Sequence, residues 1–242
     1  MIIDERLLKK AARDYGEPAF NIFNKFGHNS DVNGTFVDIW TTGGSLVRLS
    51  SAETMDIVST STADDAGGTG ARTIRIEGVA NDCSILNEDV TLDGTSTVTT
   101  SGSFLRINRM FITSSGTGQT NAGTITATSS TASTEQARID AEVGQTEKTQ
   151  FTVPLGYRVF VAELQVNAAD QSSMEGIFMT NTNNEGWRIK RRLFFPKGDV
   201  RVSLFGTILD EKTDIKVQAK SIGGVNKEVA ADWTGYLLKK HS

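Results

Sequence analysis

The stretch that decides the fold class is Arg72-Thr73-Ile74-Arg75-Ile76-Glu77-Gly78-Val79, in which isoleucine alternates with charged residues. Successive side chains of a strand point to opposite faces, so the alternation predicts one apolar and one solvated face. Such strands are typical of antiparallel sheets. We therefore predict a strand over residues 72–79.

Runs of the same kind continue on both sides of this stretch. From Thr35 onward, alternating runs are bounded by Gly, Asn, Asp and Ser, and no segment shows a sustained helical period. Asp93-Gly94 stands between two such runs, and both positions tolerate the positive φ of a two-residue hairpin turn. The sequence predicts an all-β protein with an antiparallel hairpin at Asp93-Gly94.

Composition divides the chain into three successive segments. Residues 1–34 form a predicted N-terminal helix and extended arm, residues 35–140 a Thr/Ser/Gly-rich β region, and residues 141–242 a C-terminal jelly-roll-like β-sandwich that holds most of the aromatic residues. Two β units or two layers of one sandwich both fit. The polar stretch from Ser129 to Lys148 is the candidate linker.

The N-terminal segment is predicted to begin with a short helix. Asp4 can cap its free N–H groups, Gly16 can end it and Pro18 prevents its continuation into an irregular arm. So short a helix is marginal in water, so it must dock on the β body or on a partner. Its apolar residues, with those of the arm, are candidate interface residues: Leu7, Leu8, Tyr15, Phe20, Phe23 and Phe26.

Charge and composition exclude several classes of function. The chain of 242 residues has 29 acidic and 25 basic residues, so no global positive field attracts nucleic acid or anionic lipid. We expect neither nucleic acid nor membrane as a partner, and neither a transmembrane run nor a secretory leader is visible. One cysteine and two histidines leave little for thiol, zinc or histidine chemistry. We expect no cofactor and no enzymatic activity.

Two stretches have some likeness to chemical sites. The glycines after Asp64-Asp65 could approach a phosphate, and the two carboxylates could contribute to a calcium site, but the helix of a phosphate loop and the acidic spacing of a calcium loop are missing. A connection between two strands is the simpler interpretation. Cys83 lacks a base in a recognisable motif, so we predict a half-buried strand cysteine. Paired carboxylates for glycoside hydrolysis stay open, because their separation is a three-dimensional property.

The basic run that begins at Trp187 is the strongest candidate contact surface. In a regular strand, Arg188, Lys190 and Arg192 would project to one side, while Trp187 and Ile189 would project to the other. This stripe could bind an acidic partner or phosphates. The alternative is a solvated sheet face that keeps the edge of the sheet unpaired.

Several motifs, in this order, resemble virion structural proteins of tailed bacteriophages, particularly marine ones. They are Gly27-His28-Asn29-Ser30-Asp31-Val32, Asp38-Ile39-Trp40-Thr41-Thr42-Gly43-Gly44, Gly68-Thr69-Gly70-Ala71-Arg72-Thr73-Ile74-Arg75-Ile76-Glu77-Gly78, Val90-Thr91-Leu92-Asp93-Gly94-Thr95, Phe104-Leu105-Arg106-Ile107-Asn108-Arg109, Thr152-Val153-Pro154-Leu155-Gly156-Tyr157, Lys212-Thr213-Asp214-Ile215 and Ala230-Ala231-Asp232-Trp233-Thr234-Gly235. The resemblance covers most of the chain from Gly27. It implies a part of the virion, made in the host cytoplasm, and transfers no catalytic residue.

We therefore predict a capsid-associated decoration or cement protein, folded as a jelly-roll-like antiparallel β-sandwich and assembled as a homo-oligomer such as a trimer. Its partners would be the major capsid protein or other virion proteins, and it would act by burying interface area. The alternative is a receptor- or glycan-binding module of a head or tail fibre, in which exposed aromatic residues stack on sugars. A hydrolase of host-surface polysaccharide is the third hypothesis.

Overall fold

The computed structural model describes residues 20–169, 173–195 and 199–240, and every regular element in them is a β-strand. The predicted N-terminal helix, with Leu7, Leu8 and Tyr15, lies outside the described residues. All strand pairs are antiparallel. The prediction of an all-β antiparallel fold is confirmed. Within the described ranges, no helix has the length and apolar character needed to cross a bilayer.

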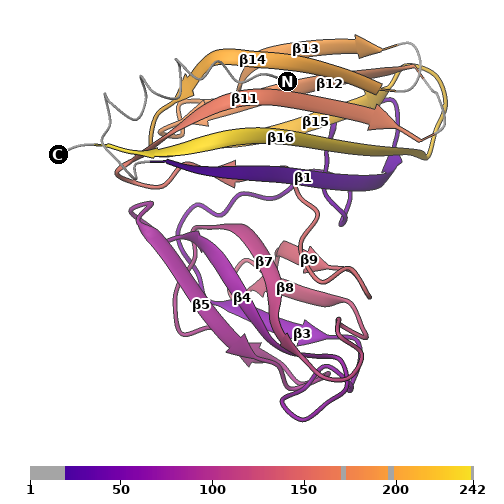
Figure 1. The fold of residues 1–242 in the computed structure, drawn as a ribbon, viewed down its shortest axis with the longest axis vertical. Helices are drawn as coiled ribbons and strands as arrows, with labels where there is room; N and C mark the ends of the chain where they lie inside the picture. Colours follow the sequence, from indigo (N-terminus) through magenta and orange to yellow (C-terminus); the bar gives the residue numbers. More distant parts are fainter. Residues whose placement is uncertain (1–19, 170–172, 196–198, 241–242) are drawn as a thin grey trace.

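The upper lobe in Figure 1 is a sandwich of two sheets. Its first sheet has the strand order β1 (Phe20–Val32), β16 (Lys227–Lys239), β11 (Tyr157–Ala168) and β14 (Asp199–Leu209). Its second sheet has the order β10 (Phe151–Thr152), β15 (Thr213–Ser221), β12 (Met174–Thr182) and β13 (Arg188–Phe195), and β2 (Val37–Asp38) also pairs with β15.

The order of these strands is that of a jelly roll, in which two Greek keys wind into two four-stranded sheets. Because β2 and β10 share one position beside β15, the upper lobe has eight strand positions along the chain. We number these positions 1 to 8 in chain order, with β1 as position 1, β2 and β10 together as position 2, and β11 to β16 as positions 3 to 8. The first sheet then has the order 1, 8, 3, 6, and the second has the order 2, 7, 4, 5. We call residues 20–41 and 147–240 the jelly-roll unit.

The second strand of the jelly roll is interrupted by the rest of the fold. Before the interruption, Asp38 pairs with Gln218, and after it Phe151 pairs with Ile215. The chain leaves and returns side by side, since the Ile39 N–H donates to the Val217 carbonyl at 3.0 Å and the Thr149 N–H donates to the Ile39 carbonyl at 3.1 Å. Residues 42–146, which we call the inserted unit, are therefore an insertion within one strand.

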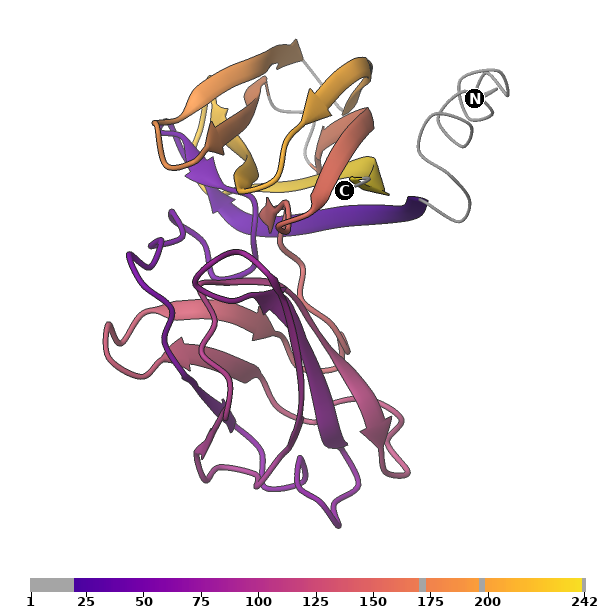
Figure 2. The same cartoon turned by 90° about the vertical axis from the view of Figure 1, so that its left-hand side faces the viewer.

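The inserted unit forms the lower lobe and has two sheets of its own (Figures 1 and 2). One has the order β6 (Val98–Thr99), β3 (Met55–Ser59), β8 (Ile125–Ser129) and β9 (Glu135–Ile139), and the other has the order β5 (Ile85–Thr91), β4 (Ala71–Val79) and β7 (Arg106–Ser115). The strand predicted from the alternating isoleucines is β4, whose Ile74 and Ile76 are fully buried.

Each lobe has its own hydrophobic core. The jelly-roll core is centred on Trp233, whose ring makes edge contacts with Phe23, Phe151 and Phe178 at centroid distances of 5.3, 5.9 and 6.2 Å. The inserted core is aliphatic, and Phe104 is the one aromatic member of its described buried cluster. Burial of these two sets of side chains is the main favourable contribution to folding of each lobe.

Three sequence expectations differ from the structure. Asp93-Gly94 does make a tight turn, with Gly94 at a φ of 56°, but the strands on either side, β5 and β6, belong to different sheets, so the predicted hairpin is wrong. The expected linker over 129–148 contains β9, which pairs with β8. The predicted irregular arm is the 13-residue strand β1, which pairs with β16 more than 200 residues later.

Candidate functional site

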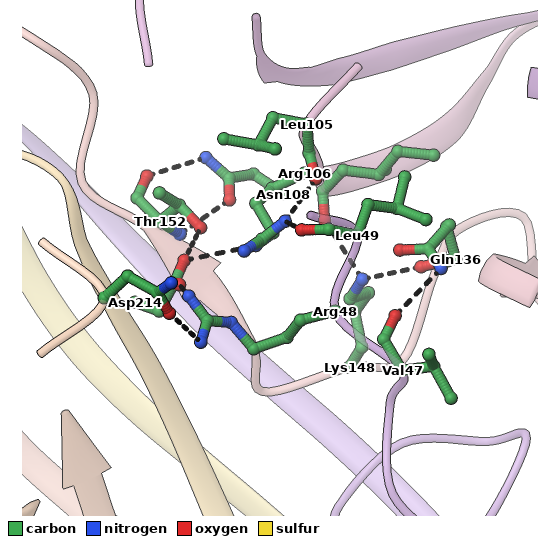
Figure 3. A network of polar contacts seen from close by, with 12 residues as sticks. Val47, Arg48, Leu49, Leu105, Arg106, Asn108, Gln136, Lys148, Thr152 and Asp214 are labelled. Carbon is green, nitrogen blue, oxygen red and sulfur yellow. Dashed lines mark hydrogen bonds and ion pairs between the residues drawn. The ribbon is translucent and has the colours of Figure 1, made fainter. Parts of the chain in front are cut away.

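The junction of the two units gathers polar residues from four distant parts of the chain (Figure 3). Arg48 follows the first crossing into the inserted unit, Arg106 begins β7, Thr152 ends β10, and Asp214 lies in β15. Because the chain leaves and re-enters the jelly-roll unit at neighbouring positions of one split strand, side chains from both units come into contact there.

Asp214 is the anionic centre of the junction and is almost fully buried. Its carboxylate accepts a hydrogen bond from the Thr152 hydroxyl at 2.5 Å and forms an ion pair with Arg48. The Nε of Arg106 lies 3.5 Å from the same carboxylate. One carboxylate is therefore the counter-ion of two guanidinium groups.

The two arginines also hold loops of both units. The Nη1 of Arg106 donates to the carbonyls of Leu49 and Leu105, at 2.9 and 2.6 Å. Burial lowers the pKa of Arg106, an effect that Asp214 opposes. Arg48 donates to the Asn184 amide oxygen at 3.1 Å. Its guanidinium lies 5.3 Å from the centroid of Trp187, a cation–π geometry.

Two fully buried lysines complete the joint. Lys148 Nζ donates to the carbonyls of Ile107 and Gln136, at 3.0 and 2.8 Å. Burial lowers the pKa of Lys148 to about 7. Lys25 of β1 donates to the Asn108 carbonyl at 2.5 Å, and burial lowers its pKa well below the ordinary value. These bonds cross from the jelly-roll unit to the inserted unit.

The amide of Asn108 fixes the register of the joint. It donates to the Thr152 carbonyl at 3.0 Å and accepts from the Thr152 N–H at 2.7 Å. A buried side-chain amide that bonds both the N–H and the carbonyl of a facing residue replaces a pair of backbone hydrogen bonds between two strands. The two lobes are thus joined by directional bonds in addition to their two chain crossings.

Two cavities adjoin this network, and Arg48 and Arg106 line both of them. The smaller has a volume of about 60 Å³, and its walls include Trp187, Lys148 and Asp38. The larger has a volume of about 450 Å³ and is lined by Arg48, Leu49, Ser50, Cys83, Leu105, Arg106, Thr152, Asn183, Asn184, Lys212 and Asp214. The larger cavity is in the size range of small-molecule sites.

The predicted interface residues of the N-terminal arm do not form one stripe. Phe20 belongs to β1, but its side chain is outside the description. Phe23 points into the jelly-roll core, where its ring stacks on that of Phe151 at a centroid distance of 4.8 Å. Phe26, three residues further along the same strand, therefore lies on the opposite face and is half-buried.

The basic stripe predicted for residues 188–192 is divided by a bulge. Strand β13 pairs Ile189 with Met179 and Arg191 with Phe178, so Lys190 is an extra residue without a partner on β12. The bulge reverses the alternation, and Arg188 and Arg192 therefore lie on opposite faces of the sheet. All three basic side chains are exposed, but they do not share one surface.

The outward face of β13 combines apolar and basic side chains. Phe194 and Ile189 are 62% and 44% exposed. Arg192 forms an ion pair with Glu175, which also lies 3.0 Å from Lys220 Nζ. Strand β13 is an edge strand of its sheet in the described residues, so it offers both this face and a row of backbone groups for contact.

The glycine-rich stretch after Asp64 is organised by a buried carboxylate. Asp64 is fully buried and accepts hydrogen bonds from the N–H groups of Ala71, Ala122 and Gly123 and from the Ser59 hydroxyl, at 2.6–2.9 Å. These donors occupy both of its oxygens, so the role of Asp64 is to hold loops together. Among the described residues, no three His, Cys, Asp or Glu come close enough to hold a metal ion.

Cys83 is a buried turn residue rather than a strand residue. It lies between β4 and β5 at a φ of 69°. Burial raises its pKa, which leaves the thiol less ionised. Its carbonyl accepts a hydrogen bond from the Leu155 N–H at 2.7 Å, so this turn contributes to the junction.

The sequence reasoning missed Arg48, Arg106 and Asp214. No local motif joins them, since they are 58 and 108 residues apart. Arg106 and Asp214 do lie in two of the quoted motifs, 104–109 and 212–215, but nothing in either motif indicates a shared site. Their convergence depends on the split strand, which composition does not reveal.

No family model matches the chain, and no curated protein matches it. Solved structures aligned with it include that of the Gt strain of infectious bursal disease virus, at 8% identity, covering 93% of this chain and 78% of that chain with a TM-score of 0.19. T=1 particles derived from infectious bursal virus align at 9% identity, covering 92% and 70%, with a TM-score of 0.19. Similarity at this level carries no argument about fold or function.

Proposed function

We propose that the protein is a structural component of a virion, of the tailed-bacteriophage kind that its sequence motifs resemble. In this role it is a capsid-associated decoration or cement protein that stabilises the particle through protein–protein contacts. Its partners are the major capsid protein or other virion proteins, and it needs no cofactor, nucleic acid, membrane or chemical reaction for this role.

The observation that carries the proposal is a jelly-roll unit with a second β unit inserted into one of its strands. Jelly rolls are used by viral capsid and lectin domains, among others, so the fold is compatible with this role without specifying it. The double crossing and the junction hydrogen bonds fasten the second lobe to the first, so that the two lie one above the other as separate bodies (Figure 2). Such a shape suits a subunit that contacts a particle with one lobe and projects the other.

The distribution of exposed apolar side chains favours the jelly-roll unit as the attachment lobe. Seven of the ten large hydrophobic residues exposed in the described chain belong to it: Ile22, Leu155, Ile189, Phe194, Ile208, Ile222 and Val225. Of these seven, Ile189 and Phe194 share the outward face of β13, and an exposed apolar pair on an edge strand is a candidate contact. The edge strand β13 carries two of these residues and is our proposed centre of the contact.

The proposal includes assembly as a homo-oligomer, with a trimer as the first arrangement to test. An edge strand with exposed Phe194 and Ile189 can pair with a neighbouring copy, because its outer backbone groups lie at the end of the described sheet. A stable interface of ordinary size would bury about 1,200–2,000 Å² in total.

The test is to add purified protein to emptied capsids of the virus that encodes it. Co-sedimentation and a raised temperature of capsid disruption are expected, and Phe194→Asp should abolish both. The matched control is Ile85→Asp, which introduces the same charge at an exposed apolar residue of the inserted unit. Failure of the wild-type protein to bind, or equal loss with both variants, would contradict the proposal.

The alternative is a receptor- or glycan-binding module of a head or tail fibre. The cavity of about 450 Å³ at the junction favours it, because small ligands occupy clefts of this size between two units. Binding to host cells or to a glycan array without any affinity for capsids would select this function over the first.

A further inference from the structure

The larger junction cavity has more positive than negative charge. Its walls include three cationic side chains, Arg48, Arg106 and Lys212, and one carboxylate, Asp214. Lys216, on the other side of the network, is paired with Asp38 at 3.1 Å. The protein as a whole has a net charge of −4, so this positive surplus is a local feature and not a reflection of composition.

Nearby acidic groups do not remove the surplus. Asp214 is shared by Arg48 and Arg106 and by the Thr152 hydroxyl. Asp82, on the neighbouring turn, is mainly bonded to Ser84, at 2.9 Å from its N–H. Glu211, which also acts on Lys212, is held by the Gly156 N–H at 2.6 Å and by Lys240 Nζ at 3.0 Å, so its charge is already paired. Counting Asp82 against the three cations still leaves one positive charge in excess. Half-buried cations that outnumber their counter-ions attract an anion, because the low local dielectric strengthens the attraction.

The two guanidinium groups also have unused donors. The Nε atoms of Arg48 and Arg106 are buried and have no hydrogen-bond partner, although Arg106 Nε is within ion-pair distance of Asp214. A buried donor without a partner carries a free-energy penalty. Guanidinium groups match the geometry of carboxylate, sulfate and phosphate oxygens, so an oxyanion in the cavity would offset the unbalanced positive charge, whereas the enclosed Nε atoms stay out of its reach.

The rest of the wall is neutral and polar. Asn183 and Asn184 occupy the turn between β12 and β13, are exposed and line the cavity, and the amide oxygen of Asn184 accepts from Arg48. Amide side chains donate and accept, as sugar hydroxyl groups do. The cavity of about 450 Å³ is large enough for one or two sugar rings.

We propose that the junction cavity binds an acidic sugar, whose oxyanion lies against Arg48, Arg106 and Lys212 and whose hydroxyl groups lie against Asn183 and Asn184. The shared chemistry is an oxyanion on a small polyhydroxylated ligand, with carboxylated and sulfated sugars as its two sources. The site does not depend on the virion role, since it is formed within a single chain from residues of both units.

Isothermal titration calorimetry on the full chain tests the proposal, with sodium glucuronate, glucose 6-sulfate and glucose as probes at fixed ionic strength. We expect either or both acidic sugars to bind at least tenfold more tightly than glucose, and the stronger one identifies the source. Inorganic sulfate should compete with it. Equal affinity for glucose and both acidic sugars, or no competition by sulfate, would overturn the proposal.

Lys212→Gln is the informative variant, because Lys212 lines the cavity while the described side-chain partners of Asp214 are Arg48, Arg106 and Thr152. Loss of one charge-assisted contact should weaken acidic-sugar binding about tenfold. Lys190→Gln removes the same charge from exposed strand β13 and should change binding less than twofold. Equal effects of the two variants would show that only overall charge matters and would refute the site. Circular dichroism and urea unfolding confirm that each variant is folded.

Discussion

The jelly-roll unit and the inserted unit use different means to close their folds. The jelly-roll unit pairs chain ends, since β1 lies beside β16, and it surrounds Trp233 with aromatic rings. The inserted unit has an aliphatic core and loops tied by the buried side chains of Asp64 and Asn121. One unit depends on long-range strand pairing, and the other on buried side-chain hydrogen bonds between loops.

This difference implies that the two units have separable sensitivities. All strand pairs of the inserted unit lie within residues 55–139, so its fold is local in the sequence. The sheets of the jelly-roll unit need strands from residue 20 to residue 239, and these strands lie on both sides of the inserted unit in the sequence. Substitutions that remove the key group of one unit should therefore leave the strands of the other protected.

The largest effect is expected from Trp233→Ala. The Trp233 ring is fully buried among Phe23, Phe151 and Phe178, and its Nε1 donates to the Thr149 carbonyl at 2.9 Å. Removing such a ring from a core lowers the free energy of unfolding by about 3–5 kcal/mol. Hydrogen exchange followed by mass spectrometry should show lost protection in β11 and β16 with β4 unchanged.

The matched control for that change is Trp187→Ala, at a half-buried ring near the surface. It removes the cation–π contacts of Arg48 and Lys216 and should cost no more than about 1–2 kcal/mol. A loss in W187A as large as in W233A would contradict the assignment of the jelly-roll core.

The second largest effect is expected from Asp64→Asn in the inserted unit. Each oxygen of Asp64 accepts two hydrogen bonds, so an amide must turn its NH₂ group toward two donors. The expected loss is about 3 kcal/mol, confined to the inserted unit. Urea unfolding with hydrogen exchange measures it. The matched control is Asp65→Asn. The amide oxygen of the new asparagine can still accept from the Gly67 N–H, so the free energy of unfolding should change by less than about 1 kcal/mol.

The joint between the units should respond to pH through Lys148. Its folded pKa of about 7 lies below the ordinary value of 10.5, so the unfolded chain binds more protons between these two values. Stability should therefore rise with pH above 7, by up to about 1.4 kcal/mol per pH unit, and Lys148 should contribute no slope well below pH 7. Buried Lys25, with its pKa shifted the same way, adds to the slope.

The measurement is the free energy of unfolding at pH 7.0, 7.75 and 8.5 for the wild type and Lys148→Met. The variant should show a smaller rise with pH, whatever its absolute stability. An identical slope in both proteins would mean that Lys148 stays charged in the folded state.

The smallest effect on stability is expected from Phe194→Ser on the outward face of β13. The side chain is 62% exposed, so the free energy of unfolding should change by less than about 0.5 kcal/mol. Because β13 is our proposed contact strand, the same variant should shift the protein toward monomers in analytical ultracentrifugation. A large loss of stability would show that Phe194 is part of the core instead.

The sequence predicted local features of the fold better than long-range ones. The alternation in 72–79 correctly indicated β4, because burial of one face is recorded in neighbouring residues. At Asp93-Gly94 the turn was correct, but Val90 of β5 and Val98 of β6 pack in the same core from different sheets, and no local pattern distinguishes that arrangement from a hairpin. The pairing of Phe23 with Gly235 has no local signal at all.

The candidate site was not predictable for the same reason. Arg106, Asp214 and Arg48 become neighbours only because one strand is split and the chain returns beside its exit. The bulge at Lys190 likewise divided a basic stripe that regular alternation had placed on one face. The sequence shows which side chains are charged. The sheet face on which each side chain lies, and the residues it contacts, depend on the strand register.

The central claim, that the jelly-roll unit holds this protein on a virion, is tested most directly by an electron-microscopy map of the particle that contains it. We predict two-lobed density, with β13 and the exposed residues of the jelly-roll unit against neighbouring subunits and the inserted unit projecting. Absence of the chain from purified particles, or density in which only the inserted unit contacts its neighbours, would contradict the account.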